Sequence, residues 1–153
     1  MPSCTKLLLS AVFATLFASA AYSQDEYAVK FVCGTPPKTP VMVAPGFYVT
    51  AVNVHNPSAS TVKFKNKVAV ALPNEKGGPI SKLIDASLDG DQALEIDCGD
   101  IFALIGGKVT FAKGFVVIQS PSELDVITVY TAAASATGTV ATMALERAPV
   151  RKN

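Results

Sequence analysis

The sequence predicts an all-β protein: a single-domain, two-layer β-sandwich of about seven to eight antiparallel strands, immunoglobulin-like or jelly-roll-like, with one disulfide. Two observations predict the sandwich. Short stretches in which apolar and polar residues alternate recur along the chain, and clusters of Gly, Pro, Asn and Ser separate them. The chain has 153 residues, the length of one domain, and contains no internal repeat or low-complexity linker. A third observation, the cysteine pattern, predicts the disulfide.

Residues 1–23 have the layout of a secretory signal peptide. Lys6 precedes an apolar run at 7–17, and small residues follow at 18–23. The apolar run is about half of the ~20 residues that a membrane-spanning helix needs, which argues against an anchor. Cleavage after Ala20 or after Ser23 fits the small-x-small rule, and the polar residues after Ser23 favour the second. We therefore expect the protein to be secreted or periplasmic.

Residues 24–146 form the predicted β-sandwich domain, and residues 147–153 form a predicted flexible basic tail. Lys6 is the only charged residue before position 24, so the rest of the chain carries twelve basic and twelve acidic residues. A net charge of zero argues against nucleic acid or an anionic membrane surface as the main partner. No segment after the signal peptide is long and apolar enough to predict a membrane span.

Cys33 and Cys98 are the two cysteines that follow the signal peptide, and in an oxidising compartment we expect them to pair. Cys33 lies on the apolar face of a predicted strand at 27–33, and Cys98 shares the face of Leu94 and Ile96. Both sulfurs should therefore point into the core. Because the chain has one histidine and no C-x-x-C motif, we predict no metal site and no cofactor.

The pattern of apolar, polar and turn-forming residues predicts the remaining elements. Residues 34–40 contain three prolines and predict an extended loop. The apolar spacing of Ile80–Asp85 predicts one or two turns of helix, and Ile101–Ile105 fits either a brief helix or a strand. The strand at 123–132 is apolar or β-branched on both faces, which predicts a central position. The predicted strands are 27–33, 47–54, 62–72, a short strand ending at Cys98, 108–119, 123–132 and 139–146.

His55 is the only histidine, so a Ser-His-Asp or Cys-His site would have to include it. No G-x-S-x-G motif is present, and neither cysteine is expected to be free. A lone histidine beside Asn56-Pro57 is more typical of a turn that is held by backbone hydrogen bonds. Because sandwiches carry function on their loops, we expect any ligand surface around His55, Asn56 and Pro57 and in residues 73–91.

Two charged clusters have both a functional and a structural explanation. Six carboxylates lie between Asp85 and Asp100, but the spaced D-x-D-x-D-G pattern of a calcium loop is missing, which favours a solvated acidic loop. Lys63, Lys65 and Lys67 form a basic stripe on one face of the strand at 62–72. The stripe would suit an anionic surface or polysaccharide. We favour the alternative, in which lysines on an exposed or edge strand prevent pairing with other chains.

Several segments resemble known proteins. Residues 48–57, residues 93–98 and the stretch 114–121 followed by Leu124-Asp125-Val126 are similar to a group of small exported bacterial proteins of uncharacterised function. The pairing of a V-I-x-S strand with a following L-D-V strand also resembles the β-sandwich of sensory rhodopsin transducers. These are core and turn patterns, so the resemblance implies a fold and transfers no functional residue.

The sequence thus predicts an exported, non-enzymatic binding or structural module whose partner is an unknown protein or envelope component. One alternative is a hydrolase with an unrecognised site around His55, which requires that His55 and acidic residues converge in one concave pocket. A second is a carbohydrate-binding module, which stacks sugars on exposed aromatic rings. The chain has no Trp, and most of its Phe and Tyr residues lie in strand phases that predict burial.

Overall fold

The computed structural model describes residues 24–38, 43–74, 76–134 and 140–152. The predicted signal peptide at 1–23 therefore lies outside the described residues. In chain order the elements are β1 (Asp25–Gly34), β2 (Phe47–His55), β3 (Val62–Ala71), β4 (Gly77–Ile80), β5 (Ile84–Leu88), β6 (Ala93–Ile96), α1 (Cys98–Ile105), β7 (Phe111–Ser120), β8 (Asp125–Ala133), β9 (Val140–Arg147) and β10 (Arg151–Lys152).

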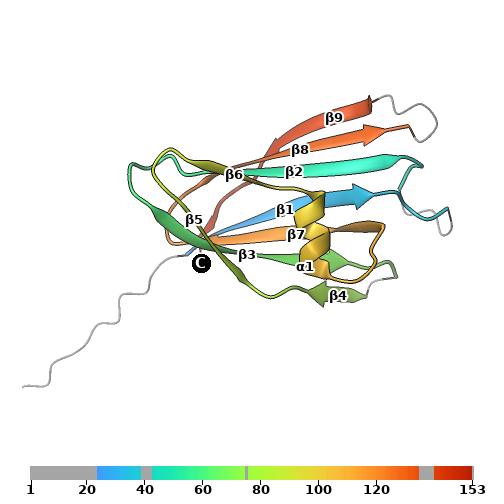
Figure 1. The fold of residues 1–153 in the computed structure, drawn as a ribbon, viewed down its shortest axis with the longest axis horizontal. Helices are drawn as coiled ribbons and strands as arrows, with labels where there is room; N and C mark the ends of the chain where they lie inside the picture. The colour runs from blue at the N-terminus through green and yellow to red at the C-terminus, as the bar shows by residue number, and fades with distance from the viewer. Residues whose placement is uncertain (1–23, 39–42, 75, 135–139, 153) are drawn as a thin grey trace, which may run out of the picture.

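The ten described strands are all antiparallel to their neighbours, and their main order is β4-β3-β7-β1-β2-β8-β9 (Figure 1). β1 and β2 pair at one position, Gly34 opposite Tyr48. Elsewhere along these two strands, β1 pairs with β10 and β2 pairs with β6. The sheet therefore divides at Gly34 into two layers, one built on β3, β7 and β1 and the other on β2, β8 and β9. The predicted all-β sandwich is confirmed.

The core lies on the inner face of both layers, where alternate residues of each long strand are buried. The hydroxyl of Tyr27, which is fully buried, accepts a hydrogen bond of 2.7 Å from the backbone N–H of Leu124 and so joins β1 to the start of β8. The largest fully buried apolar side chains are Tyr27, Phe31, Ile101, Ile118 and Leu124. Their burial supplies the main driving force for folding.

A disulfide joins Cys33, near the end of β1, to Cys98, the first residue of α1, with Cα atoms 5.5 Å apart. The predicted pairing is confirmed. The bond fixes α1 beside the point where the two layers meet. A disulfide of this kind is compatible with an oxidising compartment.

The sequence left a brief helix or a strand possible for Ile101–Ile105, and the residues at the ends of α1 explain why the segment is a helix. Asp97 is its N-cap and accepts a hydrogen bond from the Asp100 N–H, while the Asp100 side chain accepts one from the Asp97 N–H. Gly106 ends the helix with a positive φ of 76°. Among the described residues, no helix has the length and hydrophobicity that crossing a bilayer requires.

The helix predicted at Ile80–Asp85 is absent, and that prediction was wrong. Ile80 ends β4 and Ile84 begins β5, and both strands pair with the same edge of β3. Between them, the Ser81 N–H donates to the Val68 carbonyl at 2.8 Å, and the Ser81 hydroxyl accepts from the Val68 N–H at 2.9 Å. These hydrogen bonds to β3 hold the segment extended, so tertiary pairing outweighs the local apolar spacing.

The segment predicted to be a flexible tail after Arg147 is instead paired with the sheet. Ala148 is buried, and its N–H donates to the Val126 carbonyl at 2.9 Å. Arg151 and Lys152 then form β10 opposite the first residues of β1. The prediction failed because a short polar segment carries no sign of a partner that lies more than a hundred residues earlier in the chain.

Candidate functional site

The basic stripe lies on β3, which is an interior strand. β7 pairs with one edge of β3 from Lys65 to Val70, and β5 pairs with the other edge from Val62 to Asn66. Lys65 is the one lysine of the stripe that pairs on both sides, because the pairing with β7 begins at Lys65 and the pairing with β5 ends at Asn66. Lys65 is therefore not an edge residue, although Lys63 and Lys65 are exposed, as the other part of that interpretation expected.

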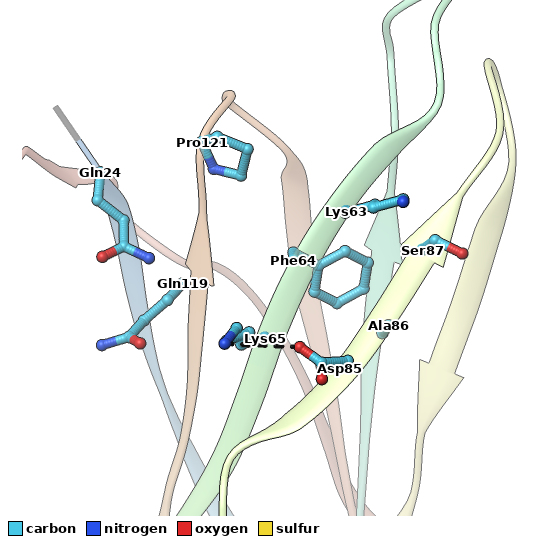
Figure 2. A pocket seen from close by; sticks show the side chains of 9 residues that line it. All are labelled: Gln24, Lys63, Phe64, Lys65, Asp85, Ala86, Ser87, Gln119 and Pro121. Carbon is cyan, nitrogen blue, oxygen red and sulfur yellow. Dashed lines mark ion pairs between the residues drawn. The ribbon is translucent and has the colours of Figure 1, made fainter. Parts of the chain in front are cut away.

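Lys63 and Lys65 border a hollow on the sheet (Figure 2). The hollow has a volume of about 710 Å³. Lys63 lies opposite Ser87 of β5, and Lys65 lies between Asp85 of β5 and Gln119 of β7, so the register places these side chains on one face. The residues that line it, called the β3 hollow below, are Gln24, Lys63, Phe64, Lys65, Asp85, Ala86, Ser87, Gln119 and Pro121.

The charge of the β3 hollow is positive. Among the described residues, Lys65 is the one lysine of the stripe with a carboxylate partner, Asp85 at 3.7 Å. Both side chains of that pair are more than half exposed, so their attraction is weak and easily exchanged for a ligand. Two further lysines extend the basic face across the sheet, since Lys113 of β7 and Lys30 of β1 share the outer phase.

Neutral hydrogen-bonding groups complete the hollow. The amide of Gln119 donates to Glu26 at 3.2 Å, and Gln24 lies on the same side of the hollow as Gln119 in Figure 2. Ser87 lies on the opposite side. Phe64 is buried, with 2% of its surface exposed, so it offers no aromatic platform to a ligand. The hollow can therefore supply two ammonium groups, two amides and a hydroxyl to a ligand rich in oxygen atoms.

His55 lies elsewhere, at the end of β2, within a charged cluster on the surface. Its Nε2 is 3.1 Å from Asp91 and its Nδ1 is 3.3 Å from Asp125, which in turn pairs with Arg147. Hydrogen bonds to Asp91 and Asp125 raise the pKa of His55 above its usual 6.5. His55 thus meets acidic side chains, as the hydrolase hypothesis required. It does not line the β3 hollow or the second cavity described below, and its side-chain partners among the described residues include no hydroxyl or thiol nucleophile.

Asn56 and Pro57, the other residues of the predicted ligand loop, have different environments. The Asn56 side chain is fully buried and donates to the carbonyls of Ser60, Leu88 and Asp89. It also accepts hydrogen bonds from the N–H and hydroxyl of Ser58. Asn56 therefore holds two loops together and has no free polar group for a ligand. Pro57 is exposed. Whether His55 and Pro57 contact a ligand stays a prediction.

The acidic loop does not gather its carboxylates at one point. Asp89 accepts a hydrogen bond from the Thr61 hydroxyl at 2.7 Å, Asp91 turns to His55, and Asp97 and Asp100 cap α1. In the part of the chain that the structure describes, no three His, Cys, Asp or Glu side chains are placed to hold a metal ion.

Sequence reasoning missed two features of the site. The floor and walls of the β3 hollow come from β5 and β7, whose pairing with β3 depends on strand order. The second feature is Asn66, which is buried on the inner face of β3 between Phe64 and Val68. The sequence did contain a signal for Asn66, because its polar amide interrupts the apolar face of a strand that alternates regularly.

No protein-family model and no curated protein sequence matches the chain. A solved structure, reported as "Crystal Structure of Thermotoga maritima 1070", is similar to it with a TM-score of 0.53 and 6% sequence identity. The similarity covers 83% of this chain and 92% of that one. At such low identity the likeness supports the fold and says nothing of function.

Proposed function

We propose that this protein is an exported, non-enzymatic binding module that holds an acidic polysaccharide in the β3 hollow. The observation that carries the proposal is the position of Lys63 and Lys65 on an interior strand, at the border of a concave surface. Lys65 pairs on both sides, so its charge is not needed to protect an edge, and one exposed carboxylate, Asp85, balances the charge of the two lysines only in part. Binding of an anion gives these lysines a function.

The stripe suits a polymer with repeated charges. Side chains at alternate positions of a strand lie about 7 Å apart on one face, so Lys63, Lys65 and Lys67 present a row of ammonium groups. The amides of Gln24 and Gln119 and the hydroxyl of Ser87 add donors for sugar hydroxyls and ring oxygens. An acidic sugar polymer offers both carboxylates and hydroxyls, whereas a simple anion would use the lysines alone.

An anionic membrane surface is the less suitable partner. The β3 hollow is concave, and none of its lining residues is an exposed large apolar side chain. Peripheral membrane binding gains much of its affinity from apolar side chains that enter the lipid. The chain as a whole also carries no excess of positive charge beyond the predicted signal peptide. The proposal therefore commits to a polysaccharide, and binding to anionic vesicles is an outcome that would count against it.

Titration with polygalacturonate, followed by calorimetry, tests the proposal. We expect saturable binding that weakens as salt rises and no binding of neutral dextran. Replacing both lysines (Lys63→Ala with Lys65→Ala) should weaken binding by at least about tenfold, because each charge-assisted hydrogen bond contributes about 1.5–3 kcal/mol. Lys38→Ala with Lys108→Ala removes the same charge from exposed positions outside the hollow and serves as the matched control.

Three results would refute the polysaccharide site: equal loss in both double variants, no binding of polygalacturonate, or preferential binding of phosphatidylglycerol vesicles. Equal loss would mean that attraction is general rather than local. Preference for vesicles would assign the lysines to a membrane surface. Circular dichroism of each variant checks that the fold is kept.

Export is the second part of the proposal, supported by the signal-peptide pattern of residues 1–23 and by the disulfide. Cleavage after Ser23 would make Gln24, a residue of the β3 hollow, the new N-terminus. Its α-amino group would then add a charge beside the hollow. Mass spectrometry of protein recovered from outside the cytoplasm gives the cleavage position, and finding the intact chain only inside the cell would contradict export.

A further inference from the structure

A second cavity, with a volume of about 310 Å³, lies among β3, β6 and α1. Asn66 and Ile96 are its buried residues and form its floor. Because side chains alternate along a strand, Asn66 points to the inner face of β3, away from Lys65 and the β3 hollow. We call this space the Asn66 cavity. It is separate from the hollow and shares no lining residue with it.

The Asn66 side chain is the unusual feature of the cavity. It is 93% buried, since 7% of its surface is exposed, and it interrupts a stripe otherwise made of Val62, Phe64 and Val68. The β3 backbone at Asn66 is paired with Ile84 and Ile118. Its side-chain amide has no protein partner among the described residues and is not one of their sealed, unpaired polar groups, so its polar atoms reach the space of the cavity. A ligand that covers this amide without a hydrogen bond would leave it unpaired, at a cost of about 1–3 kcal/mol. The cavity therefore favours a ligand that brings a polar group to Asn66.

The walls of the cavity are apolar. Ile84, Leu94 and Leu104 line it, and Ile84 remains 41% exposed. An exposed large side chain beside a concave apolar surface gains free energy when a ligand covers it. A volume of this size lies at the lower end of the range for small-molecule sites. The cavity therefore suits a short apolar chain with one polar end.

The rim sets the charge of that polar end. Glu95 of β6 and Asp100 of α1 line the opening, and no lysine, arginine or histidine is among the described residues that do so. Both are exposed, and the Asp100 side chain accepts one hydrogen bond from the Asp97 N–H, which leaves carboxylate oxygens available. A cation is attracted here and a carboxylate is repelled.

From this combination we propose that the Asn66 cavity binds a small primary amine with an apolar tail. The ammonium group donates hydrogen bonds to the Asn66 carbonyl oxygen and lies near Glu95 and Asp100. The tail packs on Ile84, Leu94 and Leu104. The site prefers ligands opposite in charge to those of the β3 hollow, and it does not depend on the function proposed for that hollow.

Titration of isotopically labelled protein with hexylamine, followed in amide NMR spectra, tests the site. We expect saturable shifts of the Asn66 side-chain amide signals and of the backbone signals of Ala103 and Leu104. Hexanol and hexanoate have the same tail, so they isolate the head group. Affinity should fall in the order hexylamine, hexanol, hexanoate.

Two variants separate the cavity from general attraction. Ala103→Leu adds bulk at the opening on an exposed helical position, where leucine is well tolerated, and should weaken hexylamine binding by at least about tenfold. Asn66→Leu should remove most of the preference for hexylamine over hexanol. The matched control is the variant with Lys38→Ala and Lys108→Ala, exposed positions outside both cavities, which should bind hexylamine as the unchanged protein does. Unsaturable shifts, equal affinity for all three probes, or full binding by Ala103→Leu would overturn the proposal.

Discussion

The ammonium group of Lys152 lies 2.8 Å from a carboxylate oxygen of Asp25, and Asp25 is almost completely buried at the start of β1. The two residues also face each other in the register of β1 and β10. A buried carboxylate is costly unless a cation or hydrogen bonds compensate it. Lys152 therefore both neutralises Asp25 and holds the C-terminal segment on the sheet.

Lys152→Met should lower the thermal unfolding midpoint by leaving the Asp25 carboxylate without its cation. Lys152→Arg should recover most of the loss, and Arg151→Met, which changes an exposed neighbour, is the control. The hydrogen bond to Asp25 raises the pKa of Lys152 above 10.5. A raised lysine pKa means that the stabilisation is present below pH 10.5 and is lost as pH rises through the folded-state value. Calorimetric scans measure the midpoint, and a result in which Arg151→Met costs as much would contradict this assignment.

Asn56→Ala should destabilise the domain by about 3 kcal/mol, because several buried hydrogen bonds disappear together and three carbonyls lose a donor. Asn56→Asp should also be costly, since a carboxylate cannot donate to these carbonyls. Urea unfolding measures the change. Asn53→Ala, on the half-buried outer phase of β2, should change the free energy of unfolding by less than about 0.5 kcal/mol. A small effect of Asn56→Ala would mean that the loop organises without it.

The long strands could be predicted from the sequence because one face of each is buried. In β3, alternation of buried and exposed residues continues from Val62 to Val68 and gives an unmistakable period of two. The short strands could not be predicted in this way. β4 and β5 owe their extended form to hydrogen bonds with β3, including those of Ser81, and no local period reveals such partners.

The candidate site could be predicted only in part, because it also depends on pairing between distant strands. The lysine stripe is a local pattern, and the sequence showed it. Its meaning depends on whether β3 is an edge strand, and strand order is set by packing between distant segments. The pairing of Cys33 with Cys98 was easier to predict, because two cysteines on apolar strand faces after a predicted signal peptide have one available partner each.

His55→Gln should reduce stability at mildly acidic pH and have little effect in alkaline solution. Hydrogen bonds that His55 donates to Asp91 and, to a smaller extent, to Asp125 raise the pKa of His55 above 6.5. With a raised pKa, protonated His55 stabilises the fold fully below pH 6.5, and this contribution is lost as pH rises through the folded-state value. Urea unfolding at a series of pH values should show a slope in this window that His55→Gln abolishes.

Asp91→Asn and Asp125→Asn should each reduce that slope, with the larger effect for Asp91, which contributes most to the shift. Asp125 also pairs with Arg147, so its replacement should lower stability across the whole pH range as well. Asp85→Asn, remote from His55 in the β3 hollow, is the control. An unchanged slope in both test variants would show that His55 titrates independently of its neighbours.

Replacing both cysteines (Cys33→Ala with Cys98→Ala) should lower the free energy of unfolding by about 4 kcal/mol, because the bond closes a long loop in the unfolded chain, between residues 65 positions apart. Urea unfolding should place the variant and the fully reduced wild type at the same midpoint, and reductant should not change the variant further. Cys33 is fully buried, so reduction has to be performed in the unfolded state before refolding. If reduction leaves the wild-type midpoint unchanged, the stability of the fold comes from packing alone, and the disulfide only fixes α1 beside β1.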